Sequence, residues 1–295
     1  DNGSWKTLKA GDGRLNKIEG KNAYQARLGA RVEPYGVFLL DVKEILSNGD
    51  LIVRNLAEKG KRRIGHVQER IEADLVYPAV RGSDISRWSA KRGVYVLMVQ
   101  DPEKSEPYSE KRVKKDWPYT FNYLTRFKDV LLSRGSRTVR ELAERTAFYA
   151  MFGIGKYTVA RYKVVWKRMA GDLVAAVVSQ AKTDFGWKMM IPTDTTAFFA
   201  AQNEDEAHYL CAVINSAPVR EFIRSYSSAG RGFGAPSVME NVGVPKFNPK
   251  NGTHAKLSEL SKMLHKVKAE GNEAKVYGLE QEVDEVVWDL FGATK

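Results

Sequence analysis

Residues Phe148 to Ala176 read FYAMFGIGKYTVARYKVVWKRMAGDLVAA. The glycines at 153 and 155, followed by Lys156, predict a turn, and an aromatic, basic and β-branched run follows it. If a strand extends from Thr158 to Met169, alternate side chains point to opposite faces, and each face mixes basic with apolar groups. Two interpretations stay open. The strand lies at a sheet edge with solvated basic residues, or it holds phosphates beside an aromatic frame.

Positive charge is concentrated around this stretch. From Arg126 to Arg168 there are eleven lysines and arginines against three acids, and the whole chain carries a net charge of +11. Bases and acids number 29 and 20 in residues 1–150, 10 and 8 in residues 151–240, and 8 and 8 in residues 241–295. Basic surfaces gain affinity for nucleic acid by releasing condensed counterions, so we expect an anionic partner, with nucleic acid ahead of a membrane surface. The neutral C-terminal part is expected to be scaffold.

Length and composition are those of a globular protein. A chain of 295 residues with 43% hydrophobic and 28% charged residues can bury one large core or two modest ones. The single cysteine, Cys211, lies in an apolar run and indicates a buried thiol in a reducing compartment. Because no spanning segment and no signal peptide are visible, we expect a cytoplasmic protein. The chain starts at Asp1 without a methionine, so we also expect an excised piece of a longer polypeptide.

The first half of the chain predicts a hairpin, a further strand and an interrupted helix. Val37–Val42 and Leu51–Asn55 flank an Asn-Gly turn, and Val94–Val99 is a third strand. Helical sequence follows, first over 106–115 and again over 119–132 after Trp117-Pro118. A glycine-flanked loop after the hairpin carries a basic cluster: Lys59, Lys61, Arg62 and Arg63.

The second half predicts three strands and four helices. Strands are expected at 173–179, 188–191 and 197–201, and helices at 203–214, 219–226, 253–270 and 279–291. We therefore predict an α+β fold, a mixed β-sheet domain with peripheral helices and two C-terminal amphipathic helices. The expected domain covers residues 1–240, with two possible lobes at 1–100 and 101–240, and residues 241–295 form a helical scaffold.

The sequence contains no catalytic constellation that we recognise. Gly155-Lys156 lacks the first glycine and the hydroxyl residue of a phosphate-binding loop, because Ala150 and Tyr157 stand at those positions. Four scattered histidines and one cysteine exclude a cysteine-based zinc site. The acidic pairs Asp84 with Asp41 and Asp194 with Asp184 lack the spacing of a nuclease motif. We predict no catalytic residue, no metal ligand and no cofactor site.

Six motifs, in this order, carry a resemblance: Ala26–Ala30 before Val37-Phe38, Val76–Trp88 (VYPAVRGSDISRW), Gly153–Tyr157 with Tyr162–Trp166, Leu210–Pro218, Val244–Phe247 and Val283–Gly292. The set resembles the C-terminal target recognition (specificity) domain of TaqI-like and type IIG adenine-N6 DNA methyltransferases. The likeness spans nearly the whole chain.

The resemblance implies a domain that reads double-stranded DNA in a bacterial restriction-modification enzyme. A separate methyltransferase catalytic domain, upstream in the same polypeptide or in another subunit, would hold S-adenosylmethionine and the Asn-Pro-Pro-aromatic motif. The parent protein would be an adenine-specific DNA methyltransferase. The missing catalytic motifs are then expected.

Charge and resemblance together select candidate DNA contacts. We assign phosphate or base contacts to Arg134, Arg137, Lys156, Tyr157, Arg161, Lys163, Arg168, Lys188 and Arg231. Arg231 lies in a Gly-rich loop that either enters a groove of DNA or is a surface connector. For Arg81, Asp84 and Arg87 we favour an internal ion-pair group beside Trp88.

Two alternatives to a DNA recognition domain stay open. One is a metal-dependent nuclease built on scattered carboxylates such as Asp84 or Asp194. The other is an interaction module that recruits a methyltransferase subunit through the neutral C-terminal helices.

Overall fold

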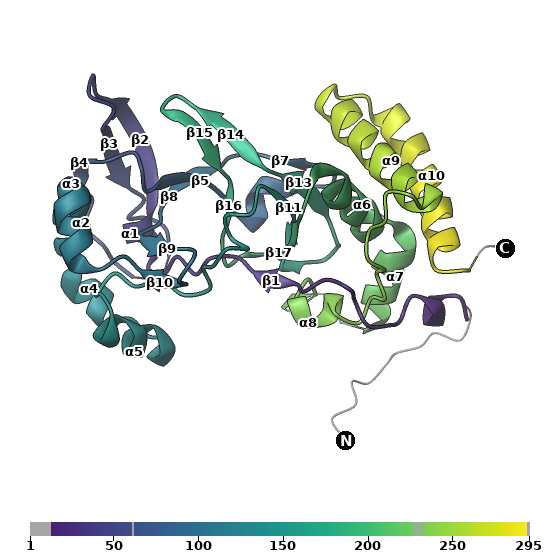
Figure 1. The fold of residues 1–295 in the computed structure, drawn as a ribbon, viewed down its shortest axis with the longest axis horizontal. Helices are drawn as coiled ribbons and strands as arrows, with labels where there is room; N and C mark the ends of the chain where they lie inside the picture. The colour runs from purple at the N-terminus through teal and green to yellow at the C-terminus, as the bar shows by residue number, and fades with distance from the viewer. Residues whose placement is uncertain (1–12, 61, 227–229, 232, 294–295) are drawn as a thin grey trace.

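The computed structural model describes residues 13–60, 62–226, 230–231 and 233–293, with only the backbone described at 226, 230 and 231. These residues form an α+β fold with two main β-sheets that lie side by side along the long axis of the molecule (Figure 1). Helices cover the outer side of each sheet, so the predicted fold class is confirmed.

The first sheet has six strands and contains the predicted hairpin. Its strands, in spatial order, are β16 (Ile191–Pro192), β5 (Val76–Val80), β8 (Val94–Leu97), β2 (Leu39–Ile45), β3 (Leu51–Asn55) and β4 (Gln68–Ile71). All neighbours are antiparallel except β16 and β5. The strand β2 begins two residues later than predicted, because Tyr35–Phe38 form one turn of helix, α1, directly after Pro34.

Four helices lie at the first sheet's end of the molecule, and the first three of them contribute residues to the hydrophobic cluster of that sheet (Figure 1). They are α2 (Glu110–Asp116), α3 (Pro118–Thr125), α4 (Lys128–Leu132) and α5 (Arg137–Arg145). The Ser109 hydroxyl caps α2 by accepting the Arg112 N–H at 3.3 Å. The predicted interruption at Trp117-Pro118 is confirmed, since Pro118 occupies the first turn of α3, where the missing N–H has no cost.

The second sheet contains the strand from the opening stretch at its centre. Its antiparallel strands are, in order, β1 (Arg27–Leu28), β17 (Thr196–Ala201), β11 (Tyr162–Lys167) and β13 (Ala175–Val178). Strand β11 pairs on both sides, and its residues 163 to 166 are all buried. Val164 and Trp166 face one hydrophobic cluster and Val165 faces another. The interpretation of β11 as an edge strand is therefore wrong.

The second sheet is covered by α6 (Glu204–Asn215), α7 (Ala217–Tyr226), α9 (Gly252–Ala269) and α10 (Glu273–Leu290). The Asn203 side chain caps α6, and three acids lie in its first turn, where the helix dipole favours negative charge. Every residue from Glu206 to Asn215 is buried, because α6 lies between α9 and the strands of the second sheet. The C-terminal helices thus share a core with the second sheet, and the expected domain division at residue 240 stays a prediction.

Short elements connect these parts. They are two 3₁₀ turns, η1 (Leu15–Lys17) and η2 (Gly82–Asp84), the helix α8 (Pro236–Met239) and four two-stranded pairs: β6–β7 (Ile85–Ser86, Ser89–Ala90), β9–β10 (Gln100–Asp101, Glu106–Pro107), β12–β18 (Met169–Ala170, Gly230–Arg231) and β14–β15 (Gln180–Thr183, Gly186–Met189). The β2–β3 and β14–β15 hairpins project on the same side of the molecule (Figure 1).

Candidate nucleic-acid interface

Lys163 lies in the protein interior and does not reach the surface. Its side chain is fully buried in β11, and its ammonium donates a hydrogen bond to the Ala160 carbonyl oxygen. Burial lowers the pKa of Lys163 to about 7. The prediction of a phosphate contact at Lys163 is corrected here, because strand alternation identifies a face without telling whether another layer covers it.

Arg134 is also a structural residue. The side chain is 4% exposed, and its guanidinium donates to the carbonyl oxygens of Leu131, Ala150 and Phe148 at 2.7, 2.5 and 2.9 Å. Burial, and secondly the nearby positive charge of Arg62, lowers the pKa of Arg134 to about 10. Because three carbonyls hold the guanidinium, the prediction of a direct DNA contact is corrected for this residue too.

Arg168 and Lys188 are half-buried and bonded to the backbone. Arg168 Nη1 donates to the Asp194 carbonyl oxygen at 2.9 Å. Lys188 Nζ donates to the carbonyl oxygens of Ala73 and Asp74 at 2.8 and 3.2 Å, and burial lowers its pKa. Both side chains fasten neighbouring segments to each other, and their contact with DNA stays a prediction.

The other predicted contacts lie on several helices, strands and loops. Arg137 is 86% exposed and pairs with Glu141 within α5, whereas Lys156 pairs with Glu103 at 2.6 Å, which raises its pKa. Tyr157 is covered by the Arg27 guanidinium, 4.6 Å from its ring centroid, and Arg161 is exposed. The Arg231 backbone pairs with Met169, and its side chain lies outside the described residues. Within the described residues, no ion pair, hydrogen bond or ring contact joins any two members of the predicted set.

A different set of basic residues does come together, in a groove formed by three adjoining cavities of about 510, 340 and 310 Å³. Lys59 lines all three, and we call this feature the Lys59 groove. Its charged lining residues are Glu33, Asp41, Lys59, Arg62, Arg81, Arg92, Arg134 and Asp184.

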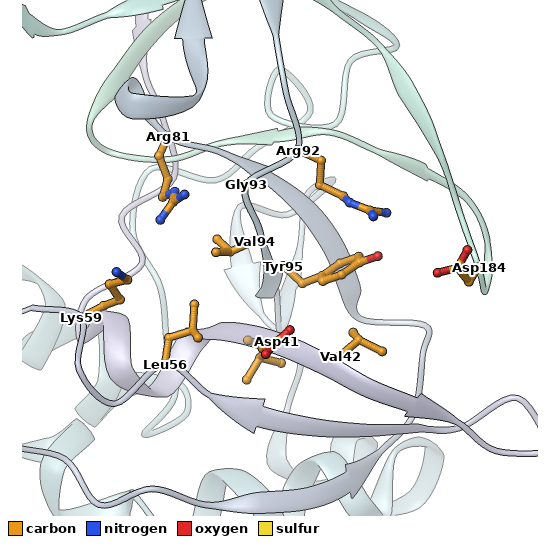
Figure 2. Close-up of a pocket in the computed structure, with 11 residues that line it drawn as sticks. Asp41, Val42, Leu56, Lys59, Arg81, Arg92, Gly93, Val94, Tyr95 and Asp184 are labelled. Carbon is orange, nitrogen blue, oxygen red and sulfur yellow. The ribbon is translucent and has the colours of Figure 1, made fainter.

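Loops and strand ends position these side chains. Lys59 follows β3, and Arg92 directly precedes β8, whose Tyr95 ring lies 5.0 Å below the Arg92 guanidinium. Asp184 lies at the turn of the β14–β15 hairpin. Figure 2 shows Lys59 and Arg81 on one side of the largest cavity and Arg92 and Asp184 on the other, with Tyr95 between them.

The charges of the Lys59 groove are unbalanced. Asp41 pairs with Lys43 and Arg54, and Glu33 pairs with Arg31 at 3.4 Å. Among the described residues, however, Lys59, Arg62, Arg92 and Arg134 have no carboxylate partner. Arg62 donates to the Val130 carbonyl oxygen and to Ser133, which leaves its positive charge uncompensated. Asp184 is the one acidic residue lining the groove that has no cationic partner within the described part of the chain.

Arg81 has a structural role at the rim of the groove. It forms a two-pronged ion pair with Asp84, with both nitrogen–oxygen distances at 2.9 Å. A Cβ atom at residue 93 would lie 2.4 Å from the Asp84 carboxylate, so only glycine leaves room for this pair. Arg87 instead pairs with Asp172 and Glu280, and Trp88 Nε1 donates to Glu280 at 2.6 Å. The favoured interpretation placed Arg81, Asp84 and Arg87 in one internal ion-pair group beside Trp88. The Arg81–Asp84 pair is confirmed, but Arg87 belongs to a separate group, with Asp172 and Glu280.

No family model and no curated protein matches this chain. The crystal structure of the type IIG restriction endonuclease BpuSI is similar over 95% of this chain, with a TM-score of 0.42 and 14% sequence identity. This chain spans 32% of that one.

Of the acids considered for a nuclease, Asp84 and Asp194 are bonded to protein partners, as is Asp41. Asp84 is held by Arg81, and Asp194 accepts a hydrogen bond from the Tyr35 hydroxyl at 2.8 Å. Within residues 13–60, 62–226, 230–231 and 233–293, no three histidine, cysteine or acidic side chains gather as a metal site would require. No helix in the same residues is long and apolar enough to span a membrane.

Sequence reasoning missed the Lys59 groove although part of its signal was visible. The basic cluster at 59–63 lies on a glycine-flanked loop, which is typical of a surface that approaches a ligand. Arg92 gave no comparable signal, because it is a single arginine before a strand. Its place beside Lys59 follows only from the pairing of β8 with β2.

Proposed function

We propose that this chain binds double-stranded DNA as the target recognition domain of an adenine-N6 DNA methyltransferase, or of a restriction-modification enzyme that contains one. The observation that carries this proposal is the charge imbalance of the Lys59 groove. Four cations there lack a carboxylate partner among the described residues, and the motif resemblance points to the same class of partner.

The groove favours an extended polyanion over a small anion. Lys59, Arg62 and Arg134 line one of its cavities, and Arg92 lines the adjoining one together with Lys59, so the positive charge extends from one cavity into the next. Phosphates along a duplex occur at regular spacing, and each neutralised phosphate releases a condensed counterion. Lys59 and Arg92, both exposed, are the proposed phosphate contacts. Arg62 and Arg134 add positive potential behind them.

The chemical step is assigned to a separate methyltransferase catalytic domain, in the same polypeptide or in another subunit, with S-adenosylmethionine as its methyl donor. A methyltransferase must extrude the target adenine from the duplex, which costs a few kcal/mol of stacking and pairing. Contacts along the Lys59 groove would offset part of that cost by holding the backbone on either side. This chain thus serves the reaction by binding and by positioning the duplex.

Duplex binding can be measured by fluorescence anisotropy with a labelled pool of random sequence between 50 and 200 mM salt. We expect the logarithm of affinity to fall linearly with the logarithm of salt, with a slope of about −0.9 for each phosphate neutralised. Lys59→Glu and Arg92→Glu are each expected to weaken binding and to reduce the magnitude of that slope by about 1.

The matched control is Lys266→Glu, which makes the same change of charge on the exposed side of α9, outside the Lys59 groove. We expect its salt slope to equal that of the unmodified chain. Equal losses in all three variants would show a general charge effect and would contradict the groove as the contact surface. Weak binding that ignores salt would contradict DNA binding altogether.

A further inference from the structure

The β14–β15 hairpin exposes a tryptophan. Trp187 is 65% exposed, whereas Trp88 and Trp166 are fully buried. A single exposed aromatic side chain is normal on a protein surface, so the meaning of Trp187 depends on its neighbours. Trp187 lies on a projecting hairpin whose turn lines the largest cavity of the Lys59 groove.

The hairpin has two distinct faces. Register pairs Lys182 with Trp187 and Gln180 with Met189, so these side chains share the outer face. On the inner side, the Phe185 ring lies 5.3 Å from Tyr95, and Lys188 bonds to the carbonyl oxygens of Ala73 and Asp74. These contacts dock the hairpin onto the first sheet together with Met189, which is partly buried against that sheet's hydrophobic cluster, whereas Gln180, Lys182 and Trp187 stay exposed.

The outer face carries the chemistry of a nucleic-acid contact. Gln180 and Lys182 are exposed, and Lys182 forms no ion pair or hydrogen bond through its ammonium within the described residues. Glutamine and lysine can hydrogen-bond base edges, and tryptophan can stack on a base or wedge between base steps. A two-stranded ribbon is also one of the elements that the major groove of B-form DNA admits.

The hairpin is also next to the proposed duplex site, since Asp184 at its turn lines the largest cavity of the Lys59 groove (Figure 2). A duplex held by Lys59 and Arg92 would therefore lie against this hairpin. We propose that the β14–β15 hairpin enters a groove of the bound duplex and that Gln180, Lys182 and Trp187 contact its bases, which makes the hairpin a determinant of sequence preference. This inference rests on the proposed function.

The experiment selects preferred duplexes from a random pool with the unmodified chain, and then compares Trp187→Ala and Lys182→Ala on the selected duplex and on the unselected pool. We expect Trp187→Ala to weaken binding to the selected duplex about 5- to 100-fold, as loss of a stacked base would. Binding to the unselected pool should change less than about twofold, because backbone contacts supply it.

Tyr277→Ala is the matched control, since Tyr277 is 67% exposed on α10, outside the groove. A second measurement uses fluorescence. DNA should quench part of the tryptophan emission of the unmodified chain, and Trp187→Phe should remove that quench while the protein still binds. Unchanged preference in both hairpin variants would overturn the hairpin proposal and would favour a protein partner for Trp187. Absence of binding by the unmodified chain would instead overturn the proposed function itself.

Discussion

Lys163 places an amine in the interior of the protein with one carbonyl oxygen as its hydrogen-bond partner. Charged amines are poorly solvated there, so the neutral form is favoured and the pKa falls to about 7. In the unfolded chain the same amine titrates near its ordinary value of about 10.4. Between these two values the unfolded chain binds a proton that the folded chain has released.

The consequence is a stability that rises with pH through this window. For one such group the free energy of unfolding increases by about 1.4 kcal/mol per pH unit. Lys163→Met should remove this dependence and should be more stable than the unmodified chain at pH 7, with the difference shrinking toward pH 10. Chemical denaturation at pH 7, 8.5 and 10 measures it.

Lys266→Met is the control. Lys266 is an exposed residue of α9, so its replacement should leave the pH dependence of the free energy of unfolding intact. The same variants separate structure from recognition, because Lys163→Met should bind duplex DNA as the unmodified chain does. A loss of binding in folded Lys163→Met protein would contradict the structural role of this lysine. So would a pH dependence of stability equal to that of the unmodified chain.

Sequence reasoning at this scale identified charge correctly and orientation poorly. It identified Lys163 and Arg134 as positively charged residues, but it did not show that other side chains cover both of them. Burial of a strand residue depends on contacts with segments distant in sequence, here Val80 and Ile85 on the face shared with Val165. No local pattern carries that information.

At the scale of elements, α6 and α9 pack through histidines. His208 Nδ1 lies 3.0 Å from the Ser261 hydroxyl, and the His208 and His265 rings meet edge to face at 4.9 Å. His265 Nε2 accepts the Val177 N–H at 3.0 Å, which joins α9 to β13. Burial, and secondly the charge of His265, lowers the pKa of His208 to about 3.

This interface should weaken in acid. Below about pH 6.5, the ordinary histidine value, the unfolded chain takes up a proton that folded His208 does not. Stability is therefore lost as pH falls from 6.5 toward 3, by about 1.4 kcal/mol per pH unit for His208 alone. His208→Asn should show a smaller drop in melting temperature between pH 7 and 5 than the unmodified chain.

His66→Gln provides the comparison, because His66 is exposed and lies on a loop outside the α6–α9 interface. It should lose stability in acid as steeply as the unmodified chain. If His208→Asn and His66→Gln have the same pH profile, protonation at His208 does not limit the α6–α9 interface.

Elements with strong local signals were predicted well. The Asn-Gly hairpin, the break at Trp117-Pro118 and the two C-terminal helices all follow from turn chemistry, proline geometry and apolar spacing. Helix α5 was missed although Val139, Leu142 and Ala143 stand at helical spacing in its sequence RTVRELAER. Its apolar stripe is short, but the signal for a helix was present.

At the scale of the whole molecule, the chain passes repeatedly between the two sheets. Residues 30–154 supply most of the hydrophobic cluster around the first sheet. Ile191 also belongs to this cluster, because it pairs with Ala79 in parallel. The hydrophobic cluster around the second sheet contains Ile18, Trp166 and residues of the C-terminal helices. Pairing across more than a hundred residues was not predictable from the sequence, because each partner is a short apolar run compatible with many neighbours.

This interleaving predicts that the two sheets unfold together. Leu131→Ala in the cluster of the first sheet and Leu264→Ala in the cluster of the second sheet each truncate a fully buried side chain. Each should lower the free energy of unfolding by about 2–5 kcal/mol. Because neither sheet has a continuous chain segment to itself, each variant should shift one shared transition. Calorimetry and tryptophan fluorescence should then report the same lowered melting temperature.

Leu132→Ala is the control for the cluster variants, since Leu132 neighbours Leu131 in α4 but is 41% exposed, so its melting temperature should change little. A different result would come from independent lobes. Leu131→Ala would then split the calorimetric trace and leave one transition at the original temperature. In that case the first sheet, whose strands β2 and β8 line the largest cavity of the Lys59 groove, would unfold on its own. With one transition the Lys59 groove is preorganised, and Lys59, Arg92 and the β14–β15 hairpin would meet the proposed duplex as a rigid surface.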